Sequence, residues 1–150
     1  MADNKPTDAV ELTRALIRCA SVTPNDGGAL GVTGAALESL GFTCNHMTFS
    51  APDTPDVDNL YARLGDSGPN FCFAGHTDVV PVGDADAWSL EPFAADIRDG
   101  ILYGRGATDM KGAVAAFIAE PIQGARREVL KQDIGLLRQF DQQRPALRRL

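Results

Sequence analysis

The segment 70–81 constrains the fold of this 150-residue chain more than any other feature. It reads NFCFAGHTDVVP and begins with a short apolar run that follows a Gly/Ser/Pro turn at 65–69. A short apolar run between turn signals is typical of a buried strand. Helix-like and strand-like patterns alternate along the rest of the chain, and the sequence therefore predicts an α/β fold.

The other elements are expected from hydrophobic spacing and from turn-forming residues. The expected helices cover about 8–19, 29–40 and 110–120. The expected strands cover about 42–49, 59–64, 94–98 and 101–103, with loops at 50–58 and 82–92. Thr7 is the expected cap of the first helix and Gly41 the expected stop of the second. Asp99-Gly100 is a strong hairpin dipeptide between the last two strands.

Composition excludes several classes of protein. The longest apolar run is the segment 113–119, which is too short for a membrane span, and the polar N-terminus argues against a signal peptide. A net charge of −6 argues against a protein that binds nucleic-acid phosphates or a membrane surface. The odd number of widely spaced cysteines indicates reduced thiols, and hence a cytoplasmic location.

The first candidate site is the sequence His76-Thr-Asp78 at the end of the apolar run. Side chains at the carboxyl ends of strands in α/β folds reach ligand crevices. A histidine here can bind a metal while Asp78 accepts a hydrogen bond from its other ring nitrogen, which fixes the tautomer. A simple hydrogen-bonded His–Asp contact is the alternative, because the short motif by itself is weak evidence.

The second candidate is the segment 104–112, which reads GRGATDMKG. Its three glycines indicate unusual backbone angles or close packing around one carboxylate, that of Asp109. This carboxylate could bridge two cations, since both of its oxygens can coordinate. The alternative is an ordinary helix N-cap, for which aspartate is a preferred residue.

Other chemistries lack support in the sequence. A GxSxG elbow, a phosphate-binding P-loop and an HExxH zinc motif do not occur. The second histidine, His46, falls in an expected strand and is interpreted as a solvent-facing residue.

Together, GHTDVVP at 75–81 and GRGATDMKG at 104–112 resemble the motifs of the M20 family of dizinc metallopeptidases. The two motifs occur in order, with His76 and Asp109 33 positions apart. The segments 17–24, 55–61 and 70–75 and the residue Trp88 extend the resemblance to the bacterial desuccinylases of that family. The likeness covers roughly residues 6–119.

The resemblance implies a metal site and a fold. His76 would ligate one zinc ion, Asp109 would bridge two, and Asp78 would be the active-site carboxylate that orients His76. A complete site would hold two Zn²⁺ ions, with Co²⁺ as a possible substitute. The peptide bond after Asp109 would be cis. The implied fold is the N-terminal part of an αβα sandwich with a mixed, largely parallel sheet.

The resemblance also implies an activity. The small-molecule substrate would be N-succinyl-L,L-diaminopimelate, whose amide would be hydrolysed to succinate and L,L-diaminopimelate in lysine and diaminopimelate biosynthesis. Zinc would polarise the carbonyl and a glutamate would deprotonate the attacking water. Full-length members would form homodimers. The alternatives are another M20 hydrolase, namely an acetylornithine deacetylase, an aminoacylase or a dipeptidase, or a non-catalytic fragment that binds metal weakly.

The last thirty residues differ in composition from the rest. Residues 121–150 hold 3 acidic and 7 basic side chains, a net +4, whereas residues 1–120 hold 17 and 7, a net −10. The family places a Glu-Glu pair and a later histidine ligand beyond the matched segment, and 121–150 contain neither. We therefore expect 1–120 to be the N-terminal part of a zinc-peptidase-like domain and 121–150 to be an atypical basic tail. A frameshifted or truncated gene would explain the change.

The spacing of apolar residues in this tail predicts a secondary structure. Leu130, Ile134 and Leu137 recur at helical intervals. They predict an amphipathic helix.

Overall fold

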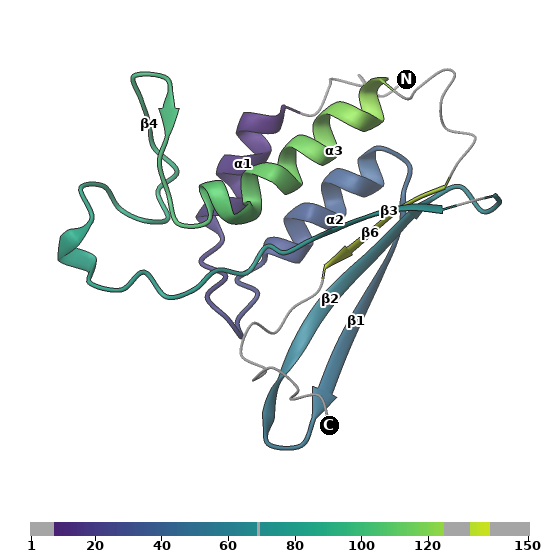
Figure 1. Ribbon diagram of the computed structural model, residues 1–150, viewed down its shortest axis with the longest axis horizontal. Coiled ribbons are helices and arrows are strands. Elements are labelled where there is room, and N and C mark those ends of the chain that lie inside the picture. Colours follow the sequence, from purple (N-terminus) through teal and green to yellow (C-terminus); the bar gives the residue numbers. More distant parts are fainter. Residues whose placement is uncertain (1–7, 69, 125–132, 139–150) are drawn as a thin grey trace, which may run out of the picture.

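A computed structural model describes residues 8–68, 70–124 and 133–138 of the chain. Three helices lie together on one face of a four-stranded sheet (Figure 1). The helices are α1 (Ala9–Arg18), α2 (Ala29–Ser39) and α3 (Gly112–Gly124). The strands of this sheet are β1 (Thr43–Ala51), β2 (Thr54–Leu64), β3 (Asn70–Gly75) and β6 (Asp133–Arg138).

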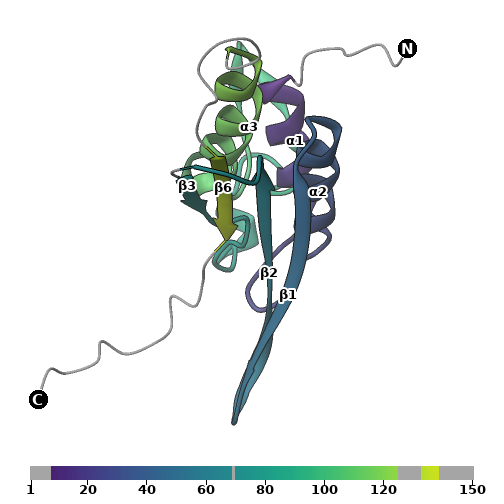
Figure 2. The same ribbon diagram turned by 90° about the vertical axis from the view of Figure 1, so that its right-hand side faces the viewer.

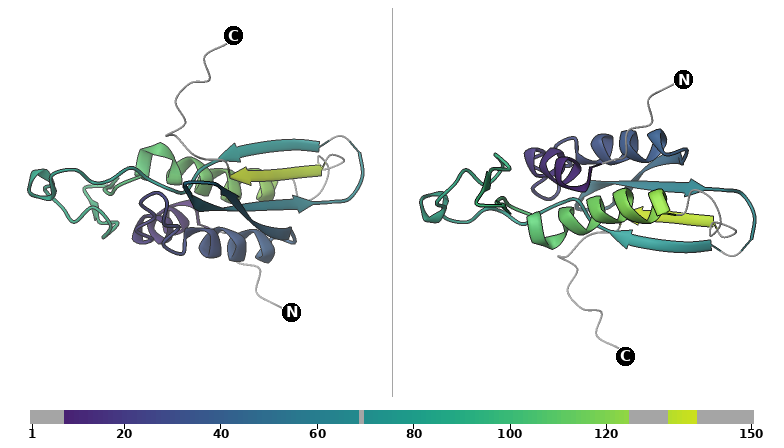
Figure 3. Two further views of the ribbon diagram at one scale, coloured as in Figure 1. Left: turned by 90° about the horizontal axis from the view of Figure 1, so that it is seen from below. Right: turned by 90° about the horizontal axis from the view of Figure 1, so that it is seen from above.

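The sheet is mixed, as predicted, but it is not largely parallel among the described strands. Its strand order is β1-β2-β6-β3, in which β1 with β2 and β2 with β6 are antiparallel and β3 with β6 is parallel. In Figure 2 the strands lie side by side in this order, and the β1–β2 hairpin extends beyond the helices. Figure 3 shows the molecule from below, with the strands toward the viewer, and from above, with the helices toward the viewer. The parallel pair places the carboxyl end of β3, and therefore His76, at one end of the sheet.

The core lies between the helices and the sheet. Leu16, Leu37, Leu60 and Ile118 are buried there, one from each of four different elements. Phe73 of β3 stacks on Phe117 of α3, with ring centroids 4.1 Å apart. Burial of large apolar side chains contributes about 1.5–3 kcal/mol each, so this layer holds β3 and α3 against each other.

Helix α1 begins one residue later than predicted. Its N-cap is Asp8, whose Oδ1 accepts hydrogen bonds from the backbone N–H of Val10 at 2.8 Å and of Glu11 at 3.2 Å. The predicted cap, Thr7, lies outside the described residues. The stop of α2 is confirmed, since Gly41 follows the helix with a positive φ of 93° and donates to the carbonyl of Glu38.

The predicted loop at 50–58 is wrong. Strand β1 continues to Ala51 and β2 begins at Thr54, so the two strands form one long hairpin. Its distal residues are exposed, and cross-strand pairing such as Thr48 with Asp58 is compatible with polar side chains there. The prolines and aspartates of this segment therefore did not indicate a loop.

A short hairpin follows the loop after β3. Its strands are β4 (Ile97–Arg98) and β5 (Ile101–Leu102), and both are shorter than predicted. The turn at Asp99-Gly100 is confirmed, with φ values of 51° and 76°. A 3₁₀ turn, η1 (Ala85–Ala87), lies in the preceding loop.

The end of the described chain corrects two predictions. The third helix was expected to begin at Met110, but that residue has non-helical angles and α3 begins at Gly112. The predicted tail helix is also wrong, because Ile134 and Leu137 lie in strand β6, while Leu130 falls outside the described residues. Backbone pairing with β2 and β3 on both sides overrides the helical spacing. None of the described helices is long and apolar enough to cross a membrane.

Candidate metal centre

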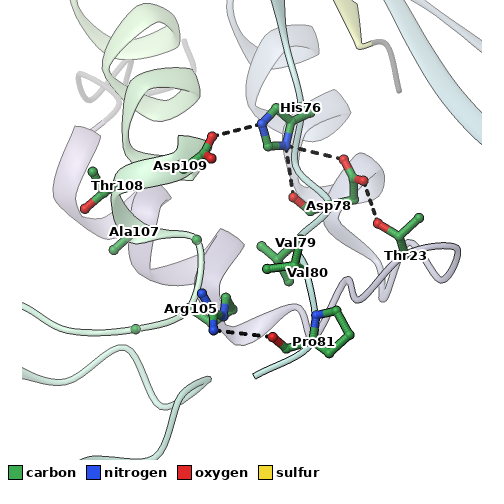
Figure 4. Close-up of a pocket in the computed structure, with 12 residues that line it drawn as sticks. Thr23, His76, Asp78, Val79, Val80, Pro81, Arg105, Ala107, Thr108 and Asp109 are labelled. Atoms are coloured by element: carbon green, nitrogen blue, oxygen red, sulfur yellow. Dashed lines mark hydrogen bonds and ion pairs between the residues drawn. The ribbon is translucent and has the colours of Figure 1, made fainter. Parts of the chain in front are cut away.

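His76 comes directly after β3, at the end of the sheet, where strand carboxyl ends present side chains to ligands. Its ring is 19% exposed. The Nδ1 atom lies 3.0 Å from the backbone oxygen of Asp78 and 3.4 Å from the carboxylate Oδ1 of the same residue (Figure 4). Both of these atoms are acceptors, so a proton on Nδ1 would point toward them and Nε2 would then be available as a ligand.

Asp109 reaches the same place from the other motif. It lies in the turn η2 (Ala107–Lys111) just before α3, and its Oδ1 lies 3.0 Å from Nε2 of His76. Its side chain is 80% exposed. Within the described chain, this carboxylate accepts no hydrogen bond from a backbone N–H of α3, so the N-cap alternative is wrong. The peptide bond from Asp109 to Met110 is cis, which confirms that expectation.

Close packing explains one glycine of the second motif. Gly106 has a φ of 83°, and a Cβ there would lie 2.6 Å from Cγ1 of Val79. Val79 follows Asp78 on the strand-end segment. The glycine therefore lets the turn that carries Asp109 approach the segment that carries His76.

Lys111, two residues after Asp109, is completely buried. Its Nζ donates to the backbone oxygens of Leu16 and Cys19, both at 2.8 Å. These carbonyls lie at the C-terminal end of α1, where a cation also interacts favourably with the helix dipole. Lys111 therefore attaches the Asp109 turn to the end of α1. No local sequence signal marks this lysine, because its partners are more than 90 positions away in the sequence.

The loop after His76 is attached to the same turn through an arginine. The Nη2 of Arg105 donates to the carbonyls of Pro81 and Val82 at 3.3 and 3.4 Å. Its guanidinium carbon lies 5.0 Å from the ring centre of Trp88, a cation–π distance. These contacts close one wall of a cavity of about 300 Å³. Residues from the N-terminal loop and from both motifs line this cavity, including Thr23, His76, Asp78, Arg105 and Asp109.

The donor atoms present fit a zinc ion in part. Two zinc ligands about 2.0–2.2 Å from a tetrahedral ion lie about 3.3 Å apart, close to the separation of His76 Nε2 and Asp109 Oδ1. Both atoms are of types that zinc takes. Across the described ranges, however, no group of three or more His, Cys, Asp or Glu side chains gathers around one point. The described residues thus supply two ligands, whereas zinc sites use three or four protein ligands.

Comparison with known proteins agrees with this site. Residues 72–141 match the peptidase family M20/M25/M40. The chain is 60% identical over 142 residues to a succinyl-diaminopimelate desuccinylase of Parvibaculum lavamentivorans, an overlap that covers 95% of this chain and 36% of that relative. The chain is thus similar to a part of the M20 peptidase family. A desuccinylase of Rhodospirillum centenum is 67% identical to it over 112 residues, which cover 75% of this chain and 29% of that M20 relative.

Solved M20 structures share the fold. The structure of human carnosine dipeptidase 1 matches with a TM-score of 0.72 and 26% identity, over 87% of this chain and 31% of that one. A metallo-carboxypeptidase from Sulfolobus solfataricus matches with a TM-score of 0.72 at 21% identity, over 88% and 30% of the two chains, and shows the fold alone. The predicted M20 fold is therefore confirmed, and the family implies dependence on a metal.

The chain spans about a third of the length of the curated relatives it matches. The family match crosses residue 120 and ends at 141. Helix α3 crosses the same position, since it runs to Gly124. The predicted boundary at residue 120 and the proposed frameshift or truncation stay predictions.

Proposed function

We propose that this chain carries part of the zinc site of an amide hydrolase that acts on N-succinyl-L,L-diaminopimelate. The observation that carries the proposal is the 3.0 Å approach of His76 Nε2 to Asp109 Oδ1, at the edge of a cavity lined by both motifs. The names and the identities of 60% and 67% of the two desuccinylase relatives support this substrate. A dipeptidase is the weaker candidate, since its structural representative is 26% identical.

Three side chains have separate roles in this proposal. His76 would ligate one zinc ion through Nε2, and the carboxylate of Asp109 would be the ligand shared with a second. Asp78 holds the imidazole by accepting a hydrogen bond from Nδ1 at its backbone oxygen, with its carboxylate also facing Nδ1. When bound, zinc would supply Lewis acidity toward the amide carbonyl and the attacking water. Co²⁺ is proposed as a substitute for Zn²⁺, the cytoplasm as the location, and a homodimer as the state of the full-length protein.

A hydrolysis assay tests this proposal in two forms of the protein. Because the described residues supply two zinc ligands, we expect the 150-residue chain to bind one zinc ion weakly and to show no hydrolysis of N-succinyl-L,L-diaminopimelate with excess Zn²⁺ or Co²⁺. A chimera supplies the rest of the site: residues 9–119 replace the matching segment of the Parvibaculum lavamentivorans relative. We expect the chimera to hydrolyse this substrate and its His76→Ala variant to be inactive. A folded chimera without activity would contradict the proposal.

A further inference from the structure

The segment that follows α1 lies along the segment that carries His76 and Asp78. Residues Val22 and Val79 form a parallel β-bridge. The N–H of Val79 donates to the carbonyl of Ser21 at 2.9 Å, and the N–H of Thr23 donates to the carbonyl of Val79 at 3.2 Å. The hydroxyl of Ser21, which is fully buried, donates to the carbonyl of Thr77 at 2.6 Å. These bonds hold the two segments in register although they are about 55 positions apart.

This register places one hydroxyl against the carboxylate of Asp78. The Oγ1 of Thr23 donates to Oδ2 of Asp78 at 2.7 Å, while Oδ1 of the same carboxylate faces Nδ1 of His76 at 3.4 Å (Figure 4). Asp78 is 12% exposed. Its two oxygens are thus directed to two different partners, Thr23 and His76.

We propose that Thr23 is a positioning residue for the metal site, acting on His76 through Asp78. A carboxylate can rotate about its bond to Cβ, and the hydroxyl of Thr23 favours the orientation in which Oδ1 faces the imidazole. The backbone bond from Thr23 to Val79 holds that hydroxyl in place. Partners of this kind orient metal ligands and raise their basicity. The inference rests on the proposed role of His76 as a zinc ligand.

Two substitutions of Thr23 separate the effect of its hydroxyl on zinc binding from the effect of its side-chain shape. Thr23→Val removes the hydroxyl and keeps the branched side chain, whereas Thr23→Ser keeps the hydroxyl and removes the methyl group. Loss of such an outer partner lowers metal affinity by about 10–100-fold. We expect Thr23→Val to lower the zinc affinity of the 150-residue chain by about tenfold and Thr23→Ser to restore it to within about twofold.

The chain offers a matched control. Thr48 donates to Oδ1 of Asp58 at 2.6 Å in the exposed β1–β2 hairpin, a hydrogen bond of the same chemistry outside the cavity that His76 and Asp109 line. Thr48→Val should leave the zinc affinity unchanged. In an Asp78→Ala background, Thr23→Val should have no further effect, because the hydroxyl has lost the acceptor through which it acts.

The experiment is a zinc titration of each variant, followed by the visible absorption of the Co²⁺ form, with circular dichroism to establish folding. Weaker zinc binding and an altered Co²⁺ spectrum in Thr23→Val, both rescued in Thr23→Ser, support the proposal. Normal binding by folded Thr23→Val overturns it. If Thr23→Val does not fold, Thr23→Ala replaces it in the comparison with Thr23→Ser. If zinc binding by the unsubstituted chain does not depend on His76, the proposed function itself fails.

Discussion

Two threonine–aspartate hydrogen bonds of nearly equal length lie at the same end of the sheet but in different surroundings. Thr23 donates to Asp78 at 2.7 Å beside His76, and Thr48 donates to Asp58 at 2.6 Å in the β1–β2 hairpin. The first joins segments 55 positions apart and is partly buried, whereas the second joins neighbouring strands and is exposed. The same two residue types thus form both bonds, but one bond orients a carboxylate beside His76 and the other joins two neighbouring strands.

The difference extends to the regions around each pair. At the site, hydrogen bonds from residues 16–23 hold both the His76 segment and the Asp109 turn. In the hairpin, pairing is between two strands that are adjacent in the sequence. We expect the geometry of a region assembled from distant segments to depend more on each single contact than that of a local hairpin does.

The largest expected effect on stability is that of Lys111→Met. The substitution keeps much of the side-chain volume but leaves the carbonyls of Leu16 and Cys19 without the donor. Hydrogen bonds to charged groups contribute about 1.5–3 kcal/mol each, so we expect the free energy of unfolding to fall by about 3 kcal/mol. Urea denaturation measures it. An unchanged midpoint would mean that this lysine does not attach the Asp109 turn to α1.

Asp78→Ala should have the next largest effect, and it should act on metal binding. It removes the carboxylate from His76 Nδ1 and leaves the backbone oxygen of residue 78 as the remaining acceptor. We expect the zinc affinity to fall by about 10–100-fold, as for other outer partners of metal ligands. The matched control in the hairpin is Asp58→Ala, whose zinc affinity in the same titration should equal that of the unsubstituted chain. If Asp78→Ala and Asp58→Ala bound zinc with equal affinity, the carboxylate beside His76 would have no special role in metal binding.

Thr48→Val should change stability only slightly. The hydrogen bond that it removes is exposed, and both partners can bond to water instead. We expect a loss of at most about 0.5 kcal/mol in the free energy of unfolding, at the low end for a hydrogen bond. Thermal denaturation of Thr48→Val and Thr23→Val tests this. A larger loss of stability in Thr48→Val than in Thr23→Val would contradict the expected difference between the two regions.

The smallest effect is one of thiol reactivity, and it needs no substitution. Burial raises the pKa of Cys19 and Cys44, with Lys111 lowering that of Cys19 to a lesser degree, whereas Cys72 is exposed. At pH 8 a raised pKa means a smaller thiolate fraction and slower alkylation. We expect Cys72 to react first with iodoacetamide, as mass spectrometry of the digested protein can show. Faster reaction of Cys19 would indicate that the end of α1 is open rather than packed at the site.

The sequence predicted the parts of this molecule that depend on local signals. The buried strand before His76, the Asp99-Gly100 turn and the stop at Gly41 follow from residue type and short-range spacing. The pairing of His76 with Asp109 was expected from two motifs that resemble those of one family. It could not be derived from either motif by itself, since each has an ordinary structural alternative.

The missed features depend on contacts between distant segments. Strand β6 was expected to be a helix because its apolar spacing is helical, but its pairing partners are β2 and β3. Thr23 and Lys111 carry no local sign that their partners are Asp78 and the end of α1. The long hairpin was missed for a different reason: exposed strands tolerate the polar residues and prolines that usually indicate a loop.

The central claim is that His76 binds zinc, and the chain's two histidines allow a direct test. His46 lies in the exposed β1 strand, and His76 lies 3.0 Å from Asp109. Calorimetric titration with zinc should show one weak site in the unsubstituted chain, the same site in His46→Ala, and no site in His76→Ala. Zinc binding that survives in His76→Ala, or that disappears in folded His46→Ala, would contradict the account.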